Sequence, residues 1–83
     1  MRRHELALLV ERGLKNDIIR HVQNKPQPLG LSQNIIQRLT FNGIIKQAGW
    51  VGKRVVWQPG PKFAGFLKQL TEMEGRIAQE AGA

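Results

Sequence analysis

The sequence predicts one small domain of the α+β class, mainly α, in which three helices, a β-hairpin and a C-terminal helix follow one another over residues 1–83. Three observations predict it. Apolar residues recur at helical spacing toward both ends of the chain, whereas β-branched and aromatic residues gather between residues 44 and 58. The 83 residues, 41% of them hydrophobic, are enough for one core but too few for two domains.

The first two helices are expected over about residues 3–12 and 14–24. Gly13 stands between them, and glycine commonly ends a helix because it adopts a left-handed conformation without strain. The second helix begins directly after Gly13, or at Asn16 if that residue caps it. It ends before Pro26, which cannot continue a helix, and a proline-containing loop follows.

The third helix is expected over residues 32–42. Ser32 is the only serine in the chain and stands where an N-cap is needed, immediately before an apolar set at helical spacing. Asn42 and Gly43 form the stop, since both residues tolerate the left-handed conformation that closes a helix.

A β-hairpin is expected over residues 44–58, with its tip at Gly49-Trp50-Val51-Gly52-Lys53. Two isoleucines open the first strand, and the second strand runs from about Arg54 to Gln58. Trp57 shares a strand face with Val55, so we expect it to pack against the body and hold the hairpin there.

The C-terminal helix is expected over about residues 61–80. Pro61 suits the first turn of a helix, and apolar residues then recur at spacings of three, four and seven. The apolar stripe continues through Met73 and Ile77, beyond the part that would close a core of this size. Two interpretations fit this extension: a homodimer interface through the C-terminal helix, or a frayed tail.

The charge of the chain is concentrated in its middle. The formal net charge is +7, yet between Ile18 and Thr71 no aspartate or glutamate occurs. A surface that excludes negative charge is expected where the partner is a polyanion, and the sequence pI near 11.0 favours nucleic acid over an acidic protein or a membrane surface. The eight basic residues of this stretch are Arg20, Lys25, Arg38, Lys46, Lys53, Arg54, Lys62 and Lys68.

Several function classes are not supported by the sequence. The chain has no cysteine, and His4 and His21, which we expect at the surface, have no partners at metal-ligand spacing. No group of residues suits nucleophilic catalysis, so we expect neither an enzyme nor a cofactor, and no small-molecule ligand is evident. No apolar run approaches the length of a membrane span, and the first residues lack the features of a signal peptide. We expect a cytoplasmic protein that does not contact a membrane.

The segment Leu39-Thr40-Phe41-Asn42-Gly43-Ile44-Ile45, followed at once by a hairpin with a basic tip, carries a family resemblance. Residues 31–58 resemble the winged helix-turn-helix superfamily, including compact bacterial and phage regulators and, more loosely, the MarR-type repressors. In that family the recognition helix typically ends in a leucine, a few polar residues and a Gly-Leu-Ile or Gly-Ile-Ile turn, and a two-stranded wing with a glycine and a basic residue at its tip follows. The stretch from Gln23 to Leu31 is longer than the usual turn of the motif.

The resemblance implies that the third helix enters the major groove of DNA and that the wing contacts the backbone or the minor groove. Asparagine and glutamine pair with adenine and arginine with guanine, whereas lysine and arginine at a wing tip reach phosphates. The alternative is a solvated helix face and lysines that prevent strand aggregation. The DNA-binding residues so predicted are Gln33, Asn34, Gln37, Arg38, Lys46, Trp50, Lys53, Arg54 and Lys62.

We therefore expect a double-stranded DNA-binding protein, a small regulator of transcription or of a mobile element, acting as a homodimer. Two alternatives remain open. The same basic face would suit a winged-helix protein that binds RNA or the ribosome through the A-form backbone. A winged helix can also serve as a protein-interaction adaptor, in which case an exposed apolar patch is expected near Trp50.

Overall fold

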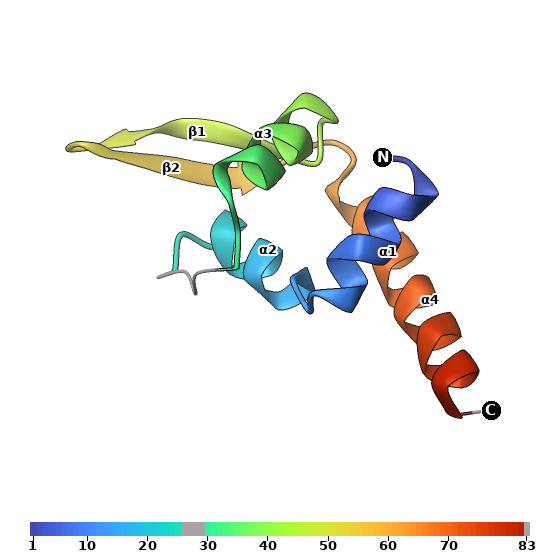
Figure 1. Ribbon diagram of the computed structural model, residues 1–83. Helices are drawn as coiled ribbons and strands as arrows, with labels where there is room; N and C mark the ends of the chain where they lie inside the picture. The colour runs from blue at the N-terminus through green and yellow to red at the C-terminus, as the bar shows by residue number, and fades with distance from the viewer. Residues whose placement is uncertain (26–29, 83) are drawn as a thin grey trace.

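The computed structural model describes residues 1–25 and 30–82. It has a mainly helical α+β fold in the predicted order, with four helices and a two-stranded antiparallel hairpin among the described residues (Figure 1). Most of the predicted loop that contains Pro26 and Pro28 lies outside the described residues. The elements are α1 (Arg3–Glu11), α2 (Lys15–Val22), α3 (Gln33–Phe41), β1 (Ile45–Val51), β2 (Arg54–Pro59) and α4 (Phe63–Gly82).

Helices α1, α2 and α3 end in the same way. In each case a backbone N–H just beyond the helix donates a hydrogen bond to the carbonyl five residues earlier, and the residue before that N–H has a positive φ. These residues are Gly13 (67°), Asn24 (59°) and Gly43 (74°). The two glycines are the predicted stops. Helix α2 ends at Val22, earlier than the predicted residue 24, because Asn24 has already left the helical conformation.

The starts of the helices differ more from the predictions. The Ser32 side chain accepts a hydrogen bond from the Ile35 backbone N–H at 3.3 Å, which confirms it as the cap of α3. Helix α2 follows Leu14 without a side-chain cap, so of the two predicted starts the one directly after Gly13 is confirmed, and Asn16 lies inside the helix. Helix α4 begins at Phe63, slightly later than predicted, after a turn closed by the Phe63 N–H and the Gly60 carbonyl.

Four side chains from four elements form the centre of the core. Ile18 of α2, Leu39 of α3, Ile45 of β1 and Leu70 of α4 each have 0% of their surface exposed. Helix α1 lies along the first part of α4 and adds two buried leucines (Figure 1). The last turns of α4 project beyond the other helices in this view, and the molecule is 50 Å long in its longest direction.

The hairpin has a longer first strand and a shorter turn than predicted, and its pairing is irregular at one point. Strand β1 extends to Val51, which pairs with Arg54, so only Gly52 and Lys53 form the turn. Gly52 has a φ of 62°, as the first position of a two-residue type II′ turn requires. The predicted five-residue tip is therefore wrong: Gly49, Trp50 and Val51 belong to the strand. A bulge at Ala48 inserts one extra residue in β1 opposite β2.

The base of the hairpin is fixed to α2 through Trp57. Its ring lies 4.6 Å from the ring of His21, centroid to centroid, at an angle of 44°. Its backbone N–H donates to the Asn24 side-chain oxygen at 2.7 Å, and its carbonyl accepts from the Asn24 side-chain amide at 3.0 Å. The anchoring role predicted for Trp57 is thereby confirmed. His21 is only 7% exposed, so the expectation that it lies on the surface is wrong.

Candidate nucleic-acid interface

The outward side of α3 carries a row of exposed side chains. Ile35, Ile36 and Leu39 turn toward the body, as predicted. Asn34, Gln37 and Phe41, spaced by three and four residues, share the opposite face and are exposed. Gln33 is exposed beside this row. Three of the four predicted groove residues therefore lie on a continuous polar surface of the helix.

Phe41 was not among the predicted site residues, although it is the most exposed large hydrophobic side chain of the described chain, at 88%. It lies at the C-terminal end of the same row. The sequence did contain a signal for it, since position 41 falls on the side of the helix opposite the apolar set Ile35, Ile36 and Leu39. An apolar ring kept in water on this face is the kind of group that marks a contact surface.

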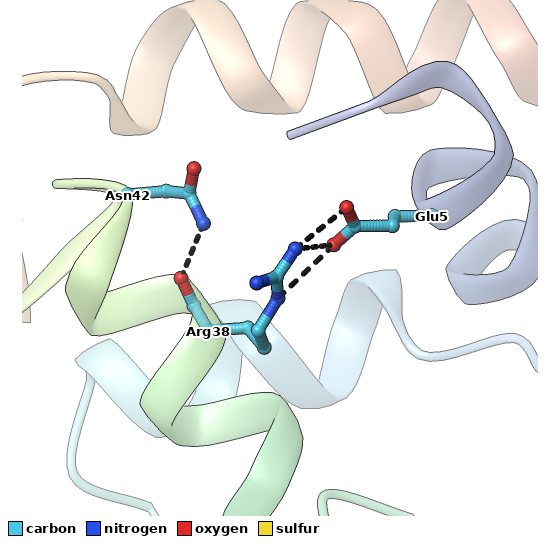
Figure 2. Close-up of polar contacts among 3 residues, drawn as sticks. All are labelled: Glu5, Arg38 and Asn42. Atoms are coloured by element: carbon cyan, nitrogen blue, oxygen red, sulfur yellow. Dashed lines mark hydrogen bonds and ion pairs between the residues drawn. The ribbon is translucent and has the colours of Figure 1, made fainter.

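Arg38, the fourth predicted groove residue, is turned toward α1. Its guanidinium forms a bidentate ion pair with the Glu5 carboxylate, with Nη2 at 2.7 Å from both oxygens and Nε at 3.2 Å from Oε2 (Figure 2). The side chain is still 56% exposed. In the same view the Asn42 side-chain amide donates to the Arg38 carbonyl at 2.7 Å, which secures the end of α3.

The ion pair changes the protonation equilibria of both groups. The hydrogen bond from Arg38 lowers the pKa of Glu5, against a smaller opposing effect of desolvation. The same hydrogen bond raises the pKa of Arg38. Both groups are therefore charged throughout the neutral range, and the Arg38 charge is largely compensated where it lies.

The position of Glu5 corrects an expectation from the charge pattern. The acid-free stretch from Ile18 to Thr71 suggested a surface without negative charge, but the fold brings a carboxylate from α1 onto the flank of α3. Glu5 and Arg38 are 33 residues apart, so no local pattern indicates the contact. Its effect is to offset part of the positive charge of Arg38 on the candidate surface.

Lys62 lies next to the C-terminal end of α3. Its backbone N–H donates to the Gly43 carbonyl at 3.0 Å, and its exposed side chain passes beside the Gly43 backbone. Gly60 completes this junction, because its N–H donates to the Ile44 carbonyl at 2.8 Å. The α3–β1 turn and the β2–α4 turn are therefore packed together, and Lys62, one of the predicted site residues, lies exposed at their junction.

The remaining predicted residues lie along the hairpin at two separate places. Lys53 and Arg54 are exposed at its tip, whereas Lys46 pairs with Gln58 near its base. Val51 at the tip lies five residues after Lys46 in β1, which corresponds to about 17 Å along a strand. Lys46 therefore belongs with Lys62 and the end of α3, and not with the tip.

Trp50 is 65% exposed and sits within β1, paired with Val55. Trp50 lies opposite Val55, and Val55 and Trp57 point to the same side of β2, so Trp50 shares a hairpin face with Trp57, farther from the core. The neighbouring Val51 is 70% exposed and points to the other face. The outer half of the hairpin thus combines apolar side chains with the cations at the tip.

Two hollows border α3. One, of about 280 Å³, lies between α1 and α3 and is lined by Leu8, Ile35 and the Glu5–Arg38 pair, among others. The second, of about 360 Å³, lies beside Asn42 and Lys62. Within residues 1–25 and 30–82, no three histidine, aspartate or glutamate side chains gather as metal ligands would. In the same ranges, no helix has the length and apolarity to cross a membrane.

Comparisons with known proteins give no match: no protein-family model, no curated protein and no solved structure matches this chain. The resemblance of residues 31–58 to the winged helix-turn-helix superfamily therefore remains a prediction from the sequence.

Proposed function

We propose that the chain is a winged-helix protein that binds double-stranded DNA, with α3 as the recognition helix and the β1–β2 hairpin as the wing. The order of three helices, hairpin and helix supports this proposal. The observation that carries it is the exposed polar face of α3. Arg38, which is ion-paired with Glu5, lies on one flank of this face, and Lys62 lies at its C-terminal end. A helix of this width fits the major groove of B-DNA, which is about 12 Å wide.

The mechanism we propose is occupancy. The α3 face contacts base edges, while Lys62 and Lys46 near its end and Lys53 and Arg54 at the hairpin tip neutralise phosphates. Such a protein regulates transcription, or the life cycle of a mobile element, by covering a site that polymerase or another factor needs.

Salt dependence of duplex binding tests this function. Fluorescence anisotropy with a mixed-sequence duplex is measured over a range of salt concentrations for the wild type and for the Lys53→Ala/Arg54→Ala variant. Loss of two phosphate contacts should make the slope of log binding constant against log salt concentration shallower by about 1.8. Arg76→Ala, which removes an exposed cation of α4, is the matched control and is expected to leave the slope unchanged. An equal effect of both variants, or binding only to structured RNA, contradicts the proposal.

We further propose that two copies associate through the C-terminal half of α4. Met73 packs against the core, and Ile77 continues the same apolar face one turn farther along the helix. The last turns of α4 extend past the other helices (Figure 1). The ion pair between Lys15 and Glu74, at 2.9 Å, joins α4 to α2 one residue after Met73. Sedimentation of the wild type as a dimer and of Ile77→Glu as a monomer is expected. A monomeric wild type at micromolar concentration contradicts this association.

A second candidate function, a protein-interaction adaptor, is favoured by one observation. Trp50 and Val51 are 65% and 70% exposed on the hairpin, and exposed aromatic groups are common at protein interfaces. This function predicts no duplex affinity at physiological salt, so the same titration distinguishes it from the first.

A further inference from the structure

The outward face of α3 has an unusual chemical composition for a DNA-reading surface. Its row consists of two amides and one phenyl ring, Asn34, Gln37 and Phe41, and no free cation. Amide side chains donate to N7 and accept from N6 of adenine in a bidentate manner. A phenyl ring has one apolar partner in the major groove, which is the C5-methyl group of thymine.

Recognition of G·C pairs requires groups that this face lacks. Guanine is read by arginine or lysine, and cytosine by a carboxylate that accepts from its amino group. Helix α3 contains no aspartate or glutamate, and its one cation, Arg38, is bonded through two nitrogens to Glu5. Both carboxylate oxygens are engaged by the guanidinium, so Glu5 is equally unsuited to contact cytosine.

The spacing of the row suits neighbouring base pairs. Asn34 and Phe41 are seven residues apart, which is about 10 Å along a helix. Base pairs stack at about 3.4 Å, so the row spans about three steps. The phenyl ring is 88% exposed and no described side chain covers it, so its apolar surface is available to the groove without rearrangement.

We propose that α3 selects A·T base pairs in the major groove, with Asn34 and Gln37 bonded to adenines and Phe41 packed on a thymine methyl group. This inference rests on the proposed DNA-binding function. It assigns to Phe41 a role in specificity, and it makes the Glu5–Arg38 pair the reason that guanine is not selected.

The test uses the whole chain and three duplexes of equal length: one rich in A·T pairs, one rich in G·C pairs, and the A·T duplex with uracil in place of thymine. Uracil lacks only the methyl group. The wild type is expected to prefer the A·T duplex and to bind the uracil duplex about fourfold more weakly, as expected for one buried methyl group.

Phe41→Ala supplies the decisive comparison. This variant is expected to bind the thymine and uracil duplexes equally, because the side chain that detects the methyl group is gone. Leu8→Ala, which truncates a 48% exposed side chain on α1, is the matched control and keeps the wild-type ratio. Circular dichroism verifies that both variants are folded.

The outcomes separate the two proposals. A wild type that binds no duplex contradicts the DNA-binding function and this inference together. A wild type that binds duplexes but ignores the base composition, or loses the same affinity to uracil before and after Phe41→Ala, overturns only the selection of A·T pairs.

Discussion

The side-chain amide of Asn24 forms two hydrogen bonds with the backbone of Trp57, as donor at 3.0 Å and as acceptor at 2.7 Å. These two bonds resemble the pair that a neighbouring strand would form. The backbone N–H and carbonyl of Trp57, on the open edge of β2, are therefore hydrogen-bonded by a side chain. Asn24 also has a φ of 59° and ends α2. One residue therefore stops a helix and fixes the hairpin to it.

Replacing Asn24 should separate these two roles. Asn24→Ala loses both hydrogen bonds and keeps a β-carbon in the left-handed region, which alanine tolerates less well than asparagine, and we expect a loss of about 2 kcal/mol in the free energy of unfolding. Asn24→Gly loses the same bonds without the backbone strain, so its loss should be about 1 kcal/mol smaller. Urea denaturation measures both. Equal stability of the two variants would show that the positive φ has no cost here.

The Glu5–Arg38 pair should make stability depend on pH at the acid end. Because Arg38 lowers the pKa of Glu5, the folded state resists protonation there. The resulting stabilisation is present above the unfolded pKa of glutamate, about 4.3, and is lost as pH falls through the lower folded value. Glu5→Gln should therefore lose less stability than the wild type between about pH 5 and pH 3. Parallel pH profiles of the two proteins would exclude the effect, which high salt should also weaken.

The same substitution should alter DNA recognition. In Glu5→Gln the Arg38 guanidinium has no charged partner and becomes available to guanine, so binding to duplexes with G·C pairs opposite α3 should strengthen about tenfold. Anisotropy titrations with the A·T-rich and G·C-rich duplexes measure the change. The double variant Glu5→Gln/Arg38→Ala is the control and should lose the gain. If the gain survives in it, the cause is the removed negative charge alone.

Gly60 should tolerate no side chain. A β-carbon at this position would overlap the Gly43 carbonyl, in the junction where Gly60 N–H donates to Ile44. Gly60→Ala must therefore disturb the backbone of both turns, and we expect a loss of about 2 to 3 kcal/mol. Gly65→Ala is the matched control: it lies in α4 with open space around it, and alanine should stabilise the helix by about 0.5 to 1 kcal/mol. Thermal unfolding should show a lower melting temperature for Gly60→Ala and a higher one for Gly65→Ala than for the wild type.

Each fully buried side chain contributes a large share of the stability of this small core. Leu39→Ala empties a position with 0% exposure between α3 and the other elements, and such truncations cost about 2 to 5 kcal/mol. A chain of 83 residues has a total stability of about 0.05 to 0.15 kcal/mol per residue, so this variant should lose a large part of that stability and unfold at a lower urea concentration than the wild type at 37 °C. Leu8→Ala, at a 48% exposed site, should remain folded. Far-UV circular dichroism at that temperature compares them.

The features that could be predicted from the sequence are those that depend on neighbours along the chain. The stops at Gly13 and Gly43 and the cap at Ser32 were predictable because each residue acts on a backbone within a few positions of itself. The hairpin and its anchor Trp57 followed from a short β-branched stretch. On α3, the exposure of Gln33, Asn34 and Gln37 followed from helical periodicity.

The features that could not be predicted depend on distant residues or on single-residue geometry. Glu5 reaches Arg38 across 33 positions, and no periodicity encodes that contact. His21 is buried because Trp57, from another element, covers it. The bulge at Ala48 lengthened β1 and moved Trp50 from the tip into the strand, since one extra residue changes the register without changing composition.

The shared ending of α1, α2 and α3 has a consequence for how the chain folds. Each of the three bonds closes a loop of only five residues, which costs little chain entropy, so the directions of these helices are set early and locally. Other contacts join residues much farther apart, such as Asn24 and Trp57 at 33 positions and Lys15 and Glu74 at 59. We expect the rate of folding to be governed by the docking of the hairpin and α4, onto helices whose turns have already formed.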